Sequence, residues 1–160
     1  MMFATSNKRY EPSVDPFEDT EVIDARAPRT NQAFVALMTG AGYLLDAEWL
    51  VALAALQLII GLTFGRQYCL PCLFYFKVMQ PRFGEGRIED SRPPRFANIV
   101  GVVFMSAATI LFILGASTAG WVLSLIVTAL AAFAVISGIC VGCEMYALWA
   151  RMRGVQLAMR

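Results

Sequence analysis

Long apolar segments alternate with short polar ones along most of this chain. The nearly uncharged runs cover residues 33–45, 49–65, 99–115 and 121–148. A bilayer core about 30 Å thick takes roughly 20 helical residues, so the first two runs are slightly short for a span and the fourth is long. The first 22 residues are polar and lack the basic start and apolar stretch of a signal peptide. We predict an all-α membrane protein with four transmembrane helices, preceded by a disordered or extended polar tail over residues 1–22.

Composition agrees with a membrane protein and excludes several kinds of chemistry. Apolar and aromatic residues make up 58% of the chain and charged residues 16%, which is too apolar for an ordinary soluble domain. A net charge of +1 leaves no basic surplus for binding nucleic acid. Histidine is absent, which excludes Ser-His-Asp and Cys-His catalysis and His-ligated zinc or haem. Chemistry is therefore left to cysteine, carboxylate, Arg, Lys or Tyr.

The basic residues predict an orientation in the membrane. They lie before the first run, between the second and third runs, and after the fourth, whereas the turns 46–48 and 117–120 carry none. Because basic loops stay in the cytoplasm, both termini and the loop 66–95 are expected on the cytoplasmic side.

Two halves of the chain repeat the same pattern. The segment DARAPR (residues 24–29) precedes the first run, and DSRPPR (residues 90–95) precedes the third. Trp49 corresponds to Trp121, and CLPC (residues 69–72) corresponds to CVGC (residues 140–143). We predict two parallel helical-hairpin repeats, over residues 23–82 with the first CxxC and residues 83–160 with the second. Since each repeat crosses the bilayer twice, their pseudo-twofold axis is expected to lie along the membrane normal.

The spacing within each repeat predicts the depth of the cysteines. About 20 residues separate the tryptophan from the CxxC in both repeats, which is about 30 Å of helix. Tryptophan at the outer interface therefore places all four thiols at the inner one. The four thiols share one site only if the second and fourth helices are neighbours.

The first cysteine pair (Cys69 and Cys72) and the second cysteine pair (Cys140 and Cys143) are the candidate reactive groups. A CxxC on a helix brings two sulfurs to one face, close enough for a disulfide or for one metal ion. Three functional interpretations stay open: a thiol relay, a tetrahedral zinc or iron site with Cys69, Cys72, Cys140 and Cys143 as ligands, and a plain disulfide. A permanent disulfide is disfavoured in the reducing cytoplasm. The alternative is that these are small apolar residues of buried helices.

The two pairs differ in their expected reactivity. The second pair lies late in the fourth predicted helix, where the helix dipole opposes a thiolate. Pro71 breaks a helix and favours the first turn of a new one, so the first pair is expected to flank the start of a short helix.

Charged residues near the cysteines supply two further hypotheses. Glu144 directly follows Cys143 and is a candidate acceptor for a thiol proton or a partner for a nearby arginine, the alternative being that it faces headgroup water. Four arginines of the repeated segments form a candidate site for sulfur oxyanions or for a partner's acidic surface, the alternative being ordinary positively charged helix starts. These are Arg26, Arg29, Arg92 and Arg95.

The segments RPPRFAN (residues 92–98) and GICVGCEMY (residues 138–146) resemble the bacterial integral-membrane family called domain of unknown function (DUF) 4395. The resemblance covers roughly residues 22–153. It implies a multi-pass protein of the bacterial inner (cytoplasmic) membrane. It also implies that the second CxxC is typical of the family while the first is often replaced, so that a four-cysteine metal site would be peculiar to this chain. The surroundings of family members imply a rhodanese-like or thioredoxin-like cytoplasmic partner.

Together these observations favour one function over a rival of another class. We expect a relay of thiol/disulfide or sulfane-sulfur equivalents at the cytoplasmic face, with the second pair as the core and the first pair as a further couple. The rival is a non-enzymatic accessory subunit of a larger membrane complex. The sequence identifies no cofactor, and zinc or iron belongs to the metal interpretation.

Overall fold

The computed structural model describes residues 21–155, and this part of the chain is mostly helical, which confirms the helical class. The predicted tail over residues 1–22 lies almost entirely outside the described residues. In chain order the elements are β1 (Val22–Asp24), α1 (Arg26–Leu44), α2 (Glu48–Thr63), the 3-10 helix η1 (Arg66–Tyr68), α3 (Leu70–Phe74), the π-helix η2 (Tyr75–Met79), α4 (Gln80–Phe83), β2 (Ile88–Asp90), α5 (Arg92–Ile113), α6 (Ser117–Ser137) and α7 (Val141–Met152).

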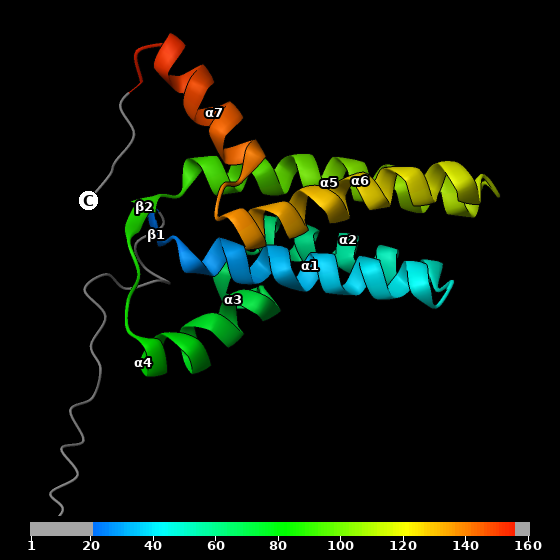
Figure 1. Cartoon of the computed structure of the whole chain (residues 1–160), viewed down its shortest axis with the longest axis horizontal. Coiled ribbons are helices and arrows are strands. Elements are labelled where there is room, and N and C mark those ends of the chain that lie inside the picture. Colours follow the sequence, from blue (N-terminus) through cyan, green and yellow to red (C-terminus); the bar gives the residue numbers. More distant parts are fainter. Residues whose placement is uncertain (1–20, 156–160) are drawn as a thin grey trace, which may run out of the picture.

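Four long helices, α1, α2, α5 and α6, run side by side along the long axis of the molecule (Figure 1). Helix α1 packs on α6, and α2 packs on α5. The two hairpin turns meet at one end, where Ser117 Oγ donates a 2.7 Å hydrogen bond to Glu48 Oε1. At the other end α3 and α4 diverge to one side of the bundle and α7 to the opposite side (Figure 1).

Two of these helices, α5 and α6, are long and apolar enough to cross a membrane. Helix α2 is apolar too but has only 16 residues. Helix α1 begins with the charged residues Arg26 and Arg29 and has 19 residues.

The bundle carries its small residues inside and many of its large apolar residues outside. Ala54 and Ala108 are fully buried, whereas Leu37 is 72% exposed and Ile136 is 86% exposed. Large exposed apolar surface is unfavourable in water, and helices in lipid pack through small residues instead. This distribution supports lipid, rather than water, as the surroundings of the bundle.

The prediction of one continuous helix over residues 121–148 is wrong. Helix α6 ends at Ser137, and Gly138 caps it in the left-handed conformation at φ +75°. Glycine adopts this conformation without steric cost and so stops the helix. A new helix, α7, begins three residues later, directly after Cys140.

A short pair of strands joins the two halves of the chain at the end of the bundle. Strands β1 and β2 are antiparallel, with Val22 opposite Asp90 and Asp24 opposite Ile88. Each strand ends in an aspartate that accepts the backbone N–H of the arginine two residues later, at 2.9 Å in both cases. This local bond favours a turn, which explains why each Asp-x-Arg segment starts a helix. Neither strand is predictable from the apolar runs.

Candidate functional site: two cysteine pairs

Cys140 is the N-terminal cap of α7. Its backbone is extended, with φ −86° and ψ 111°, and its Sγ accepts the backbone N–H of Cys143 at 3.4 Å. From α1, Gln32 Nε2 donates a second hydrogen bond to the same sulfur at 3.1 Å. Cys140 therefore sits at the positive end of a 12-residue helix with donors directed at its sulfur.

These donors lower the pKa of Cys140 to about 6. The hydrogen bond from the S–H of Cys143 lowers the pKa of Cys140 most, and burial acts in the opposite direction. The backbone N–H of Cys143 and the side chain of Gln32 lower this pKa further. The pKa of Cys143 is raised, because its S–H is held by Cys140 and because burial and nearby negative charge disfavour a second thiolate. The expectation that the helix dipole opposes a thiolate here is wrong, because the helix break places these cysteines at a helix start.

The first cysteine pair lies at the beginning of α3, on the other side of the bundle. Cys69 is the N-terminal cap, Pro71 lies in the first turn, and Cys69 and Cys72 are joined by a disulfide. The prediction that Pro71 starts a short helix at this pair is confirmed. Cys69 is buried and Cys72 is half-buried, so Cys72 is the more accessible sulfur.

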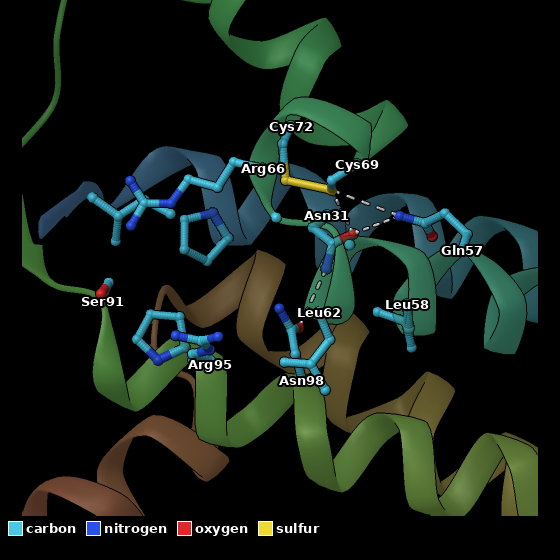
Figure 2. A pocket seen from close by; sticks show the side chains of 15 residues that line it. Asn31, Gln57, Leu58, Leu62, Arg66, Cys69, Cys72, Ser91, Arg95 and Asn98 are labelled. Atoms are coloured by element: carbon cyan, nitrogen blue, oxygen red, sulfur yellow. Dashed lines mark hydrogen bonds between the residues drawn. A yellow bond between two sulfur atoms is a disulfide. The ribbon is translucent and has the colours of Figure 1, made fainter. Parts of the chain in front are cut away.

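An amide cluster of Asn31, Gln57 and Asn98 lies beside the disulfide (Figure 2). Gln57 Nε2 donates to Asn31 Oδ1 at 3.1 Å and lies 3.8 Å from Cys69 Sγ. Asn31 Nδ2 in turn donates to Asn98 Oδ1 at 3.3 Å. Gln57 Oε1 is buried and has no hydrogen-bond partner among the described residues. Sequence reasoning missed these residues, although Gln57 lies inside the apolar run 49–65 and an amide there is a usable signal, since polar groups are expensive in lipid.

Two cavities flank the amide cluster. One of about 150 Å³ lies beside the first cysteine pair, and one of about 110 Å³ lies beside Cys140. Asn31, Leu58 and Asn98 line both cavities, so the cavities share a wall.

The four sulfurs do not form one set of metal ligands. Within residues 21–155 no three His, Cys, Asp or Glu side chains come together as a group that could hold a metal ion. The four-cysteine metal site is therefore not assembled in this conformation.

The four arginines proposed as an anion site have separate contacts. Arg26 donates to Phe83 O at 3.5 Å and Arg29 donates to Gly138 O at 3.0 Å. Arg92 lies 3.7 Å from Asp90 Oδ1. Only Arg95 of the four lines the cavity beside the first pair. The structure thus distributes these residues over several roles, and Arg29 holds the chain where α6 ends.

Glu144 is exposed in the first turn of α7. Its negative charge and that of Glu89 help to raise the pKa of Cys143. Its role as a proton acceptor stays a prediction.

Gly142 allows α7 to approach α5 closely. A Cβ at this position would lie 2.9 Å from Ala97 Cβ and 3.2 Å from Ala97 Cα, so the two helices would have to separate. We expect Gly142→Ala to cost about 1–3 kcal/mol of stability and to weaken the hydrogen bonds to Cys140. Thermal unfolding in detergent measures the first effect. Gly101→Ala is the matched control, because its Cβ would meet only Leu58 Cδ1 at an ordinary 3.5 Å. Equal losses in both variants would contradict the close approach.

Comparison with known protein families gives a match over most of the chain. A protein-family model described as Domain of unknown function (DUF4395) matches residues 23–151. No curated protein and no solved structure matches the chain.

Proposed function

This chain belongs to the DUF4395 family, and we propose that it is a membrane-embedded thiol relay in which Cys140 attacks a partner's disulfide and Cys143 resolves the product. The observation that carries the proposal is the position of Cys140 as the cap of α7, with the N–H of Cys143 and the amide of Gln32 directed at its sulfur. An activated thiolate with a second thiol three residues away is the arrangement that thiol–disulfide exchange requires.

The relay is proposed to work from a four-helix membrane bundle. The exposed apolar faces of α1, α2, α5 and α6 support four spans, although α2 is short and would use local thinning of the bilayer or tilt of its neighbours. In this arrangement both termini and the cysteine end of the bundle face the cytoplasm, because the basic residues gather there. Helix α7, with exposed Met145, Leu148 and Trp149, would then lie in the inner interface.

The repeat is proposed as the origin of this bundle. The helix contacts of the two halves support it. The packing of α1 against α6 corresponds to the packing of α5 against α2, and the packing of α1 against α3 corresponds to that of α5 against α7. Cys69 and Cys140 both cap a short helix with nearly the same extended backbone, at ψ 107° and 111°. A pseudo-twofold axis along the bundle accounts for both correspondences and for the antiparallel pairing of β1 with β2.

The Cys140 thiolate attacks one sulfur of the partner's disulfide, forming a mixed disulfide and expelling the partner's other sulfur as a thiolate. Cys143 then loses its proton and attacks Cys140 Sγ, forming the Cys140–Cys143 disulfide and releasing the partner's second thiolate. Two electrons pass from this chain to the partner, which becomes a dithiol after taking up protons. A thioredoxin-like cytoplasmic protein supplies a disulfide of this kind, and a rhodanese-like protein would offer a persulfide sulfur to the same thiolate.

The pH dependence of the exchange rate tests the proposal. At pH 7 a thiol with a pKa near 6 is about nine-tenths thiolate, whereas one at the ordinary 9.0 is about one-hundredth ionised. A thiolate of lower pKa is also a weaker nucleophile, which reduces its exchange rate by about 15- to 30-fold. The net gain in exchange rate at pH 7 over an ordinary thiol is therefore about three- to sixfold. We expect the rate with an oxidised thioredoxin-fold protein to rise through pH 6 and to level off above about pH 7. Stopped-flow fluorescence measures the rate, and a rate that climbs steadily to pH 9 contradicts the proposal.

A further inference from the structure

The cavity beside the first cysteine pair is a separate chamber in which a disulfide forms part of the wall. Its volume is about 150 Å³, and residues of α1, α2, α3, η1 and α5 line it. Figure 2 shows the disulfide at one side, with Arg66 and Arg95 on opposite walls and the amide cluster at the inner end. The proposed relay of the second pair does not use this chamber.

The lining of this chamber favours an anion. Arg66 and Arg95 belong to its wall, and no acidic residue of the described part of the chain does. The guanidinium of Arg95 makes no ion pair or hydrogen bond with another residue in the described range 21–155, so its charge is available to a ligand. A concave site lined by one sign of charge concentrates ions of the opposite sign and accelerates their arrival.

The disulfide in the chamber wall indicates which kind of anion could react there. A disulfide reacts with thiolates, and Cys72 is the accessible sulfur of this pair. A cavity of about 150 Å³ holds a molecule of about six non-hydrogen atoms, such as benzene. A short thiol with a carboxylate has this size, and it places its sulfur and its charge at opposite ends.

We propose that the chamber between the Cys69–Cys72 disulfide and Arg95 is a binding site for a small thiol that carries a carboxylate, and that this thiol reduces the disulfide. Its thiolate attacks Cys72 Sγ, forms a mixed disulfide and expels Cys69 as a thiolate. Gln57 Nε2, 3.8 Å from Cys69 Sγ, is placed to stabilise the leaving thiolate. A second molecule of the thiol attacks the ligand sulfur and releases Cys72. The products are one small-molecule disulfide and the Cys69–Cys72 dithiol, so two electrons pass from the two thiols to this chain.

The test compares probe thiols that differ in charge. The full chain, purified in neutral detergent and oxidised at Cys69–Cys72, is treated with 3-mercaptopropionate, 2-mercaptoethanol or cysteamine. Each rate is divided by the rate of the same thiol with diethyl disulfide, an uncharged reference, which removes differences in thiol pKa. Peptide mass spectrometry after alkylation follows the two cysteines individually. We expect 3-mercaptopropionate to be faster than 2-mercaptoethanol by about three- to tenfold after this division, with cysteamine the slowest. The mixed disulfide is expected on Cys72.

Two arginines of α5 provide a matched pair of variants. Arg95→Gln is expected to reduce the preference for 3-mercaptopropionate to less than about twofold, because it removes the guanidinium of the chamber wall that makes no ion pair or hydrogen bond with another described residue. Arg92→Gln is expected to keep the preference, since Arg92 lies beside Asp90 and outside the chamber. Equal preference for all three thiols in the unmodified chain overturns the proposal, as does the same loss in both variants, which would indicate a general surface field.

Failure of this proposal is distinguishable from failure of the relay. The measurement is repeated with the double variant Cys140→Ser, Cys143→Ser, which has no second pair. Persistence of the charge preference supports the chamber independently of the relay. Loss of the preference in this variant shows that reduction passes through the second pair and overturns direct attack on Cys72.

Discussion

Replacing Cys140 with serine is expected to abolish exchange with a thioredoxin-like partner, with a loss of at least about 100-fold. In this variant the remaining thiol, Cys143, no longer contacts a Cys140 thiolate, but its burial and the negative charges of Glu89 and Glu144 still disfavour its own thiolate and keep its pKa raised, so it does not take over the attack at neutral pH. The measurement is the reduction of the partner's disulfide, read from its tryptophan fluorescence or from alkylation of its released thiols. Retention of a tenth or more of the rate would remove Cys140 from its proposed role.

Replacing Cys143 is expected to trap the mixed disulfide between Cys140 and the partner, whereas Cys140→Ser cannot form it. Cys143→Ser lacks the resolving thiol, so the mixed disulfide between Cys140 and the partner accumulates and is seen on non-reducing gels. Serine keeps an O–H that can donate to Cys140, whereas Cys143→Ala removes this donor. Since the side chain of Cys143 contributes most to lowering the pKa of Cys140, the alanine variant is expected to form the same intermediate more slowly below pH 8. Failure of both variants to trap a partner would contradict the resolving role.

Replacing Asp24 with alanine is expected to cause the largest loss of stability, about 3–5 kcal/mol. Asp24 is 3% exposed, and its carboxylate accepts hydrogen bonds from Tyr75 Oη at 2.7 Å, Gly86 N at 2.8 Å and Arg26 N at 2.9 Å. One side chain therefore holds together the start of α1, the helix η2 and the loop before β2. Its loss would loosen α3 and with it the first cysteine pair.

Unfolding by denaturant in neutral detergent measures this effect, and two variants calibrate it. Tyr75→Phe removes a single bond to the carboxylate and is expected to cost about 1.5–3 kcal/mol. Lys77→Ala changes an exposed residue of η2 and is expected to leave stability within about 0.5 kcal/mol of the unmodified chain. A loss below about 1 kcal/mol for Asp24→Ala would show that the three bonds do not carry this junction.

The positions of the long helices follow from the apolar runs, because α1, α2 and α5 each contain most of a predicted run. The fourth run is divided between two helices, α6 and α7. A single glycine inside an apolar segment is compatible with a continuous helix, and only the left-handed conformation of Gly138 identifies the break. That break reverses the expected electrostatics of Cys140, since it changes a helix end into a helix start.

The candidate cysteines were identifiable from their spacing, whereas their partners were not. Gln32 lies 108 residues from Cys140 in the chain, and no periodicity relates an amide on α1 to a sulfur at the start of α7. Gln57 lies 12 residues from Cys69, and only the turn between α2 and α3 brings the two together. The pairing of β1 with β2 was equally invisible, because three-residue strands have no measurable alternation.

The sequence by itself determined the apolar helices, the two CxxC pairs and the proline that starts α3, because each depends on residues close together in the chain. Tertiary packing decided everything that depends on which helices are neighbours. It placed Gln32 against Cys140, put the amide cluster between two cavities, and gave Arg95 rather than the other three arginines a place beside the disulfide. Reactivity belongs to this second group, because the charge of a sulfur is set by donors that only folding brings within hydrogen-bond distance.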